Sequence, residues 1–462
     1  METLQRTANR GSVSTSYDVD NSLKFEPDNS EYLKWTNIST YATSARKKTF
    51  SFSVWFKISE LGVQRTIWST AANGYLLLQA DGELKWQQSY ASSVKVLQTN
   101  RVLRDTSAWY NVIVAVDTTQ STEANRQRIY INGVEETSFS TSTYPSQNDE
   151  ADNVYESFHS LGAYNASSIF WSGYMCDVAF ISDAQITPSD VGEFDSGSGI
   201  WKPKSYSGGS APSYFLEFKD SSDLGSATGL DADTLNNITA ADQSTDTCTN
   251  NFCTLNPLVN FKYTTNGITE GATEFGDNTG GGVGGAFGTF AVTQGKWYWE
   301  VKLSKQSDHY IGVSAVDDGD NVFASTDPQD ENSSFVFNIS VARIEYVNSG
   351  TKSYGSADAF TDFHSAGDII GIALNMDDNQ ISIYGNGTLQ SGVANSSIYD
   401  AANKMVVPFH GTINDECQYN FGGYSAWTPS SAVNDANGYG TFEYSPPSGY
   451  YSLCSKNLAE FG

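Results

Sequence analysis

The sequence predicts an all-β protein composed of two antiparallel β-sandwich domains, and three observations support this prediction. Apolar and polar residues alternate with a period of two in many short stretches, as in strands with one buried face. Asp-Gly and Asn-Gly pairs follow several of these stretches and indicate hairpin turns. The length of 462 residues is too great for one ordinary hydrophobic core, so at least two domains are expected.

The composition agrees with this fold class and narrows the function. Aromatic residues make up 13% of the chain, and such residues suit the pleated, half-buried surface of a sheet. The formal net charge of -27 repels phosphate backbones and anionic lipids, which argues against nucleic acid as a partner. No stretch approaches the ~18 consecutive apolar residues of a membrane span, so no membrane insertion is expected.

The first series of alternating stretches begins near residue 23. In its stretch SFSVWFKI, the apolar face carries Phe52, Val54, Phe56 and Ile58. The pairs Asp81-Gly82 and Asn132-Gly133 are expected to close two hairpins. The pair Thr187-Pro188 predicts a short helix, because Thr is a favoured cap and Pro is favoured at the first helical position.

The motifs of this first series have a characteristic order. They are SFSVWFKI, DGELKW, WYNVIVAVD, RIYINGVEE and SGYMCDVAFIS, the last followed by the short helix. With these motifs, residues 22–200 resemble the laminin-G/pentraxin group of concanavalin A-like, jelly-roll-like sandwiches. The resemblance implies glycan binding as the usual use of the fold, and it implies calcium as an accompanying ion in many relatives.

A second alternating series begins after residue 258. Its motifs are GKWYWEV, YIGVSAV, GDIIGIALNMDDNQISIYGNGT, and VVPFHG leading to YNFG. They occur in the order of the SPRY family, which residues 259–446 resemble. SPRY domains are binding modules without catalytic machinery, so the resemblance implies a partner-binding role through the loops at the end of the sandwich.

Three segments flank or join the two predicted domains. Residues 1–21 are polar and unpatterned, and we expect an N-terminal arm that is docked on its own domain or on a partner. Residues 201–258 are rich in Ser, Thr, Asp, Asn and Gly, which indicates either a linker or an extension wrapped over the first domain. Residues 447–462 are expected to form a C-terminal tail.

The whole arrangement also resembles bacteriophage virion proteins of the tail or fibre type. The resemblance rests on TNNFCTLNPL (residues 249–258), PPSGYYSLCSKNL (residues 446–458) and the pairing of the two domain types. It implies other virion proteins and further copies of the chain as partners, with a host surface glycan as a candidate ligand. The first twenty residues lack the apolar segment of a Sec signal, which fits assembly in the host cytoplasm.

The cysteines fit a reducing compartment. There are five of them, and this odd number in a long chain argues against a disulfide scaffold, so we expect free thiols. They are Cys176, Cys248, Cys253, Cys417 and Cys454. A single bridge between Cys248 and Cys253 remains an alternative.

One string suggests enzymatic chemistry. EPDNSE, from Glu26 to Glu31, matches the E-x-D-x-x-E pattern of laminarinase-type glycoside hydrolases, which share the concanavalin A-like fold. Those enzymes place their acids alternately on one strand face. Here Pro27 interrupts the string, and the residues after it favour a turn. We therefore expect an acidic surface loop and no catalytic residues.

Two sets of residues are candidates for ligand contacts. Asp317, Asp318 and Asp320 form the densest acidic turn and are candidate calcium ligands, although they lack the spacing of an EF-hand loop. Tyr90, Tyr164 and Trp171 lie in loop-like surroundings and are candidates for stacking on sugar rings. The simpler interpretation is a solvated turn in the first case and core packing in the second.

These observations predict a non-catalytic structural protein of a phage particle, on a tail, fibre or capsid appendage. They establish no cofactor, and calcium is the one candidate. The rival hypothesis is a free lectin or glycoside hydrolase of the concanavalin A-like fold, in which Glu26 and Asp28 line a cleft. An intracellular adaptor that uses the SPRY-like domain is a third hypothesis, but it gives no reason for the first domain.

Overall fold

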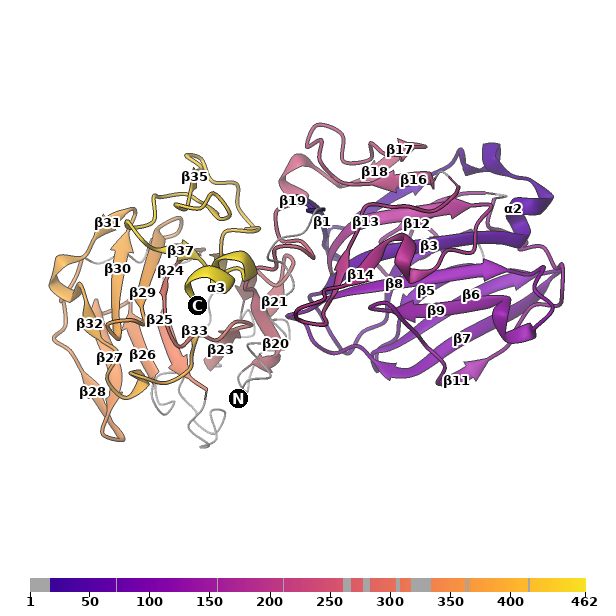
Figure 1. Ribbon diagram of the computed structural model, residues 1–462. Coiled ribbons are helices and arrows are strands. Elements are labelled where there is room, and N and C mark those ends of the chain that lie inside the picture. The colour runs from indigo at the N-terminus through magenta and orange to yellow at the C-terminus, as the bar shows by residue number, and fades with distance from the viewer. Residues whose placement is uncertain are drawn as a thin grey trace. The chain divides into compact units, whose positions relative to one another are not determined.

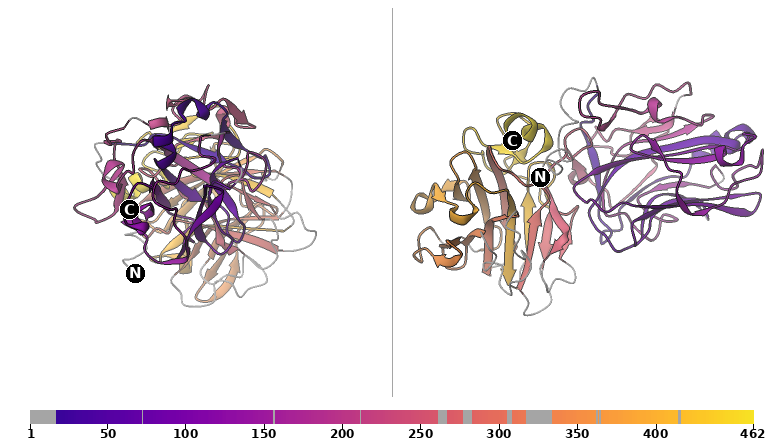
Figure 2. Two further views of the ribbon diagram at one scale, coloured as in Figure 1. Left: turned by 90° about the vertical axis from the view of Figure 1, so that its right-hand side faces the viewer. Right: turned by 60° about the horizontal axis from the view of Figure 1, so that its bottom comes forward.

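The computed structural model describes residues 17–71, 73–155, 157–210, 212–260, 267–276, 283–304, 308–316, 334–361, 363, 365–413 and 416–462. These residues form two compact units, whose boundary lies between Asn250 and Asn251. The regular secondary structure of both is dominated by antiparallel strands, which confirms the predicted all-β class (Figure 1). The further views show the same predominance of strands (Figure 2). No helix of the described ranges is long and apolar enough to cross a membrane.

Two sheets form the first unit, residues 17–250. The eight-stranded sheet has the order β11 (Phe139–Ser142), β7 (Ser93–Val102), β6 (Glu83–Tyr90), β5 (Tyr75–Leu78), β4 (Arg65–Thr70), β12 (His159–Leu161), β2 (Tyr32–Trp35) and β18 (Thr234–Asn236). The nine-stranded sheet has the order β10 (Val134–Glu135), β9 (Gln127–Ile131), β8 (Trp109–Asp117), β3 (Thr49–Ile58), β13 (Gly173–Ser182), β1 (Ser22–Phe25) and β19 (Gln243–Ser244), with β16 (Pro212–Leu216) and β17 (Thr228–Gly229) branching from β13.

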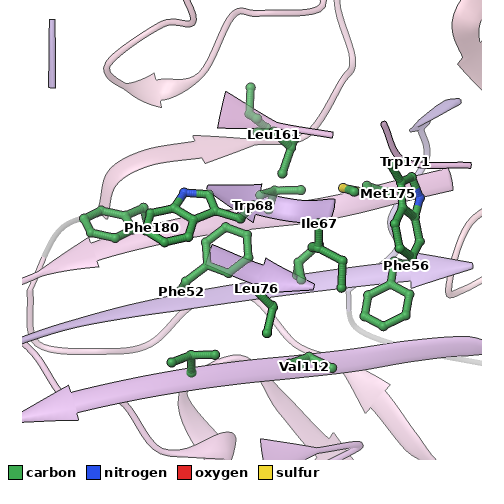
Figure 3. Close-up of a cluster of buried hydrophobic side chains, with 14 of the residues drawn as sticks. Phe52, Phe56, Ile67, Trp68, Leu76, Val112, Leu161, Trp171, Met175 and Phe180 are labelled. Carbon is green, nitrogen blue, oxygen red and sulfur yellow. The ribbon is translucent and has the colours of Figure 1, made fainter. Parts of the chain in front are cut away.

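The predicted strand faces and turns of this unit are confirmed. The apolar face of β3 lies in the core between the sheets, where Phe52 and Phe56 are within a cluster that includes Trp68 and Phe180 (Figure 3). The turn between β9 and β10 has positive φ at both central residues, 48° at Asn132 and 77° at Gly133. Such a turn matches the twist of paired strands. The predicted short helix is the 3₁₀ turn η3 (Pro188–Asp190).

Small helices and a ribbon complete this unit. They are η1 (Ile38–Tyr41), α2 (Ser44–Lys48), η2 (Glu123–Asn125), η4 (Ala240–Asp242), and the ribbon of β14 (Gly192–Phe194) with β15 (Trp201–Pro203). The polar stretch after residue 200 contributes β15 to β19 and η4, so residues 201–250 are part of the first unit. The last described residues of the arm are held here, because Tyr17 donates a hydrogen bond to Asp177 at 2.7 Å.

Two further sheets form the second unit, residues 251–462. The seven-stranded sheet has the order β20 (Leu255–Asn260), β23 (Val283–Gly288), β33 (Val406–Ile413), β25 (Asp308–Ala315), β26 (Ser334–Asn338), β27 (Arg343–Asn348) and β28 (Thr351–Tyr354). The other has the order β21 (Ile268–Thr269), β22 (Glu274–Gly276), β34 (Glu416–Asn420), β24 (Lys296–Leu303), β29 (Ile369–Asn375), β30 (Gln380–Gly385) and β31 (Thr388–Leu389), with β32 (Ser396–Ser397) on β30 and β37 (Tyr451–Ser452) on β24.

The remaining elements of the second unit are short. They are η6 (Ser391–Val393), η7 (Tyr399–Ala401), the ribbon of β35 (Val433–Asn434) with β36 (Thr441–Phe442), and α3 (Ser455–Phe461). The predicted apolar faces are confirmed, since Trp297 and Trp299 of β24 are completely buried in the core of this unit.

The other face of β24 is buried as well, because the C-terminal residues fold over it. Glu300 on that face is completely buried, and its carboxylate accepts hydrogen bonds from the backbone N–H groups of Glu443 at 2.8 Å and Tyr444 at 2.9 Å. Burial raises the pKa of Glu300 to about 7. The C-terminal segment is therefore integral to this unit.

Candidate functional site

The outer face of the nine-stranded sheet is covered and cannot take a ligand without rearrangement. Lys57 of β3 points outward from the core but is only 1% exposed, because the segment after β19 lies over it. Its ammonium group forms an ion pair with Asp246 at 2.8 Å, and Trp109 donates its indole N–H to the same carboxylate at 3.1 Å. A buried ion pair of this kind needs such additional hydrogen bonds to offset desolvation.

The outer face of the eight-stranded sheet is also covered at its centre, where Ser69 and Ser160 are completely buried and Tyr75 and Gln87 are 9% exposed, but Lys34 and Lys85 on this face are partly exposed. Side chains paired directly across antiparallel strands share one face of the sheet. One such row crosses six strands and contains Lys34, Ser160, Ser69, Tyr75, Gln87 and Val96. With strands about 4.8 Å apart, the part of the row from β2 to β6 extends over about 19 Å. We call this surface the row face.

Aromatic rings and two lysines give the row face its chemistry. The Lys34 ammonium group lies 4.5 Å from the ring centroid of Phe158, and the Lys85 ammonium group lies 5.7 Å from that of Tyr75. Within the described part of the chain, neither lysine has an ion-pair partner; each has an aromatic ring instead. Tyr75 donates a hydrogen bond to the Gln87 side chain at 2.6 Å, which fixes its ring.

Of the three predicted sugar-stacking residues, the structure brings one to the row face. Tyr164 is partly exposed and contacts Tyr75 edge to face, with ring centroids 5.7 Å apart. The other two pack in the core, as the simpler interpretation of the sequence predicted, and are not available as candidates. Tyr90 ends β6 with its side chain in the core, and Trp171 packs on Phe56 in the core at 5.2 Å (Figure 3). Both rings are completely buried and cannot stack on a sugar.

The acidic string EPDNSE lies in the turn between β1 and β2, not along a strand. Asp28 is exposed, whereas Glu26 and Glu31 are 4% and 2% exposed. Glu31 forms an ion pair with the buried Lys24 at 3.2 Å, and burial raises the pKa of Glu31 to about 7. Among the three acids, the expected surface position thus holds for Asp28 only. The three acids do not occupy alternate positions of one strand, which the hydrolase arrangement needs.

The predicted calcium ligands Asp317, Asp318 and Asp320 lie outside the described residues. Among the residues that the structure does describe, no group of three or more His, Cys, Asp or Glu side chains could hold a metal ion.

Sequence reasoning did not select most of the row face. Lys85 and Gln87 could have been found from the sequence. The Asp81-Gly82 turn fixes the pairing of β5 with β6, and along β6 these two residues alternate with the buried Leu84 and Trp86, so they lie on the outer face. Lys34 and Phe158 could not, since the pairing of β2 with β12 joins segments more than a hundred residues apart.

Comparison with known proteins supports both domain assignments. Residues 27–192 match the family model of the concanavalin A-like lectin/glucanases superfamily, of the laminin G type, and residues 296–424 match that of the SPRY domain. The chain thus contains a concanavalin A-like domain followed by a SPRY domain. Both resemblances inferred from the sequence motifs are confirmed. No curated protein matches the chain.

Several solved structures are similar to parts of this chain. A heptameric pentraxin from Limulus polyphemus is 17% identical, with coverage of 37% of this chain and 80% of the pentraxin and a TM-score of 0.26. The SPRY domain of human HERC1 is 16% identical, with coverage of 36% and 96% and a TM-score of 0.24. Domains LG4-5 of the mouse laminin alpha1 chain are 10% identical, with coverage of 88% and 90% and a TM-score of 0.28.

Proposed function

We propose that this chain is a non-catalytic binding protein that holds an oligosaccharide on the row face of its concanavalin A-like domain. The observation that supports the proposal is a set of partly exposed groups on this face: Lys34 beside the ring of Phe158, Lys85 near Tyr75, and the ring of Tyr164. Sugars present apolar ring faces and many hydroxyl groups, and such a surface can contact both.

The charge of the row face favours an acidic oligosaccharide, one with carboxylate or sulfate groups. The chain has 53 acidic and only 26 basic residues, yet Lys34 and Lys85 stand on this face without an acidic partner within the described residues. An ammonium group on an aromatic ring remains free to pair with an anion on its open side. The two lysines would attract an anionic ligand locally, whereas the net negative charge of the protein repels it elsewhere.

The finer part of the proposal concerns where the protein acts. We propose that it is a structural component of a bacteriophage particle, on a tail, fibre or capsid appendage, and that the SPRY domain contacts other virion proteins or a second copy of the chain. The support is the sequence resemblance of residues 249–258 and 446–458. The row face would then contact glycans of the host surface.

Binding is tested with the full chain on an array of acidic and neutral oligosaccharides, with and without calcium, followed by titration calorimetry on the best ligand. The variants Lys34→Gln and Lys85→Gln each remove one positive charge from the row face. The matched control is Lys219→Gln, which removes one charge from an exposed site that follows β16 of the other sheet. We expect each row-face variant to weaken binding about tenfold, because one charged hydrogen bond contributes about 1.5 kcal/mol. The control should bind as the wild type does.

Equal affinity of the wild type, both row-face variants and the control variant would refute the row face as the binding site. Binding that is restricted to neutral glycans would refute the preference for an acidic oligosaccharide but would leave the glycan-binding function supported.

The virion part has a separate test, mass spectrometry of gradient-purified particles followed by antibody labelling in the electron microscope. A fixed copy number and one labelled location are expected. If the chain is found only in the soluble fraction, the virion role is refuted and a free lectin is the better description.

A further inference from the structure

Two thiols of the concanavalin A-like unit lie in contact although they are far apart in the sequence. The sulfur atoms of Cys176 and Cys248 are 3.6 Å apart, and 72 positions separate the two residues in the chain. Cys176 is a buried residue of β13, and Cys248 lies in the segment that follows β19 and is partly exposed. Both are free cysteines.

The segment that carries Cys248 is held in place independently of the sulfur contact. Two residues before it, Asp246 forms the buried ion pair with Lys57 at 2.8 Å. One residue after it, the Thr249 hydroxyl group accepts a hydrogen bond from the Val19 N–H at 3.1 Å and donates one to the Val19 carbonyl at 2.9 Å. The position of Cys248 over β13 is therefore fixed on both sides.

The backbone at Cys176 has room for a small adjustment. The pairing of β13 with β3 shifts register between Cys176 and Ala179, which is a bulge, and the intervening Asp177 has a φ of 52°. A disulfide needs a sulfur–sulfur distance of about 2.05 Å, so the two sulfur atoms must approach by about 1.5 Å. Rotation of the two side chains, with slight movement at the bulge, can supply this.

We propose that Cys176 and Cys248 are a disulfide-forming pair, which is reduced where the protein is made and is oxidised by a small-molecule disulfide such as oxidised glutathione. The partly exposed Cys248 loses its proton, and its thiolate attacks one sulfur of glutathione disulfide and releases one glutathione thiolate. Cys176, once deprotonated, then attacks the Cys248 sulfur of the mixed disulfide and releases the second glutathione. Two protein thiols are oxidised, one glutathione disulfide is reduced, and the two protons pass to the two glutathione thiolates.

The bridge would clamp the segment after β19 onto β13. That segment covers the outer face of the nine-stranded sheet, so the clamp would fix the cover and, through Thr249, the end of the N-terminal arm. Burial raises the pKa of both thiols, so the reaction should accelerate as pH rises, because thiolates are the reactive species. None of this depends on glycan binding.

The experiment uses the full chain, first reduced and then incubated with oxidised glutathione at pH 8. We expect the intact mass to fall by two hydrogen atoms, and tryptic peptides 129–204 and 220–262 to be joined. The second peptide also contains Cys253, so fragment spectra must place the link on Cys248. Closing a loop of this length should raise the Tm of the concanavalin A-like unit by on the order of 10 °C.

The variants Cys176→Ser and Cys248→Ser serve as matched controls, since each leaves one thiol of the pair. Both should keep the reduced Tm after the same treatment, and Cys176→Ser should stop at the glutathione adduct of Cys248. The proposal is overturned if all five thiols of the treated wild type remain open to alkylation after unfolding, or if the link is formed with Cys253 instead.

Discussion

His159 provides a pH-dependent test of the core of the concanavalin A-like unit. It is completely buried, and its Nε2 lies 2.6 Å from the Val154 carbonyl oxygen, which can only accept a hydrogen bond. Nε2 therefore carries the proton, and Nδ1 accepts a hydrogen bond from the Tyr214 hydroxyl group at 3.2 Å. The Tyr214 oxygen in turn accepts the indole N–H of Trp68 at 3.0 Å. In this network the imidazole is neutral.

Burial lowers the pKa of His159 from 6.5 to about 3. The unfolded chain thus binds a proton at a higher pH than the folded chain does. The free energy of unfolding must fall as the pH drops below 6.5, and the loss is complete only near pH 3. At pH 4.5 this one residue should already have cost about 2.7 kcal/mol relative to pH 7.5, since each unit of pH in this window contributes about 1.4 kcal/mol.

The assay is urea denaturation of wild type and His159→Gln at several pH values between 7.5 and 4.5. The variant has no titrating group at this position. Any loss of stability that arises from the altered packing in the variant should therefore be the same at every pH. Subtracting the two curves cancels every other titrating group, including the buried His410 of the SPRY unit. We expect the difference to change by about 2.7 kcal/mol over this range. Parallel curves would show that His159 is not a buried neutral imidazole and would refute the reasoning.

Three further predictions concern stability. Asp246→Asn removes the carboxylate that pairs with the buried Lys57 ammonium group at 2.8 Å and should lower the free energy of unfolding by about 3–5 kcal/mol in urea denaturation; a loss below 1 kcal/mol would contradict this. Glu300→Gln replaces an acceptor with an N–H donor and should expose the C-terminal residues to limited proteolysis, with a cost of about 1–3 kcal/mol; unchanged cleavage would count against it. Gly133→Ala should lower Tm by several degrees, because the new methyl group collides with the Trp201 ring and φ is 77°; an unchanged Tm would show that the ring moves freely.

The strands were predictable from sequence because their information is local. The alternation in SFSVWFKI determines which face of β3 is buried. Asn132-Gly133 determines the turn between β9 and β10, because few other pairs adopt positive φ at both positions. The same locality explains the errors. Trp171 has loop-like surroundings in the sequence and was therefore a candidate for sugar stacking, yet it packs on Phe56 in the core. Which large ring fills a gap between two sheets depends on packing across distant strands, and no local pattern reports it.

The buried charges were the second feature that sequence reasoning could not place. Lys57 has the position of a solvent-facing residue in an alternating strand, and the alternation alone predicts an exposed side chain. It is buried because a segment almost two hundred residues later lies over it and brings Asp246. The pairing of opposite charges over such a distance has no periodic signal, and only the fold reveals it.

This cover also determines where a ligand can bind. A two-sheet sandwich has two outer faces, and in this unit residues beyond the 27–192 family match supply the cover of one of them. Removing that cover would expose Lys57 and Asp246 as separate charges and break the contacts of Thr249 with Val19, so it is part of the folded state. The remaining face keeps partly exposed rings and two lysines that lack acidic partners within the described residues. The extension therefore makes the first face unavailable, and this is why we place the proposed ligand on the row face.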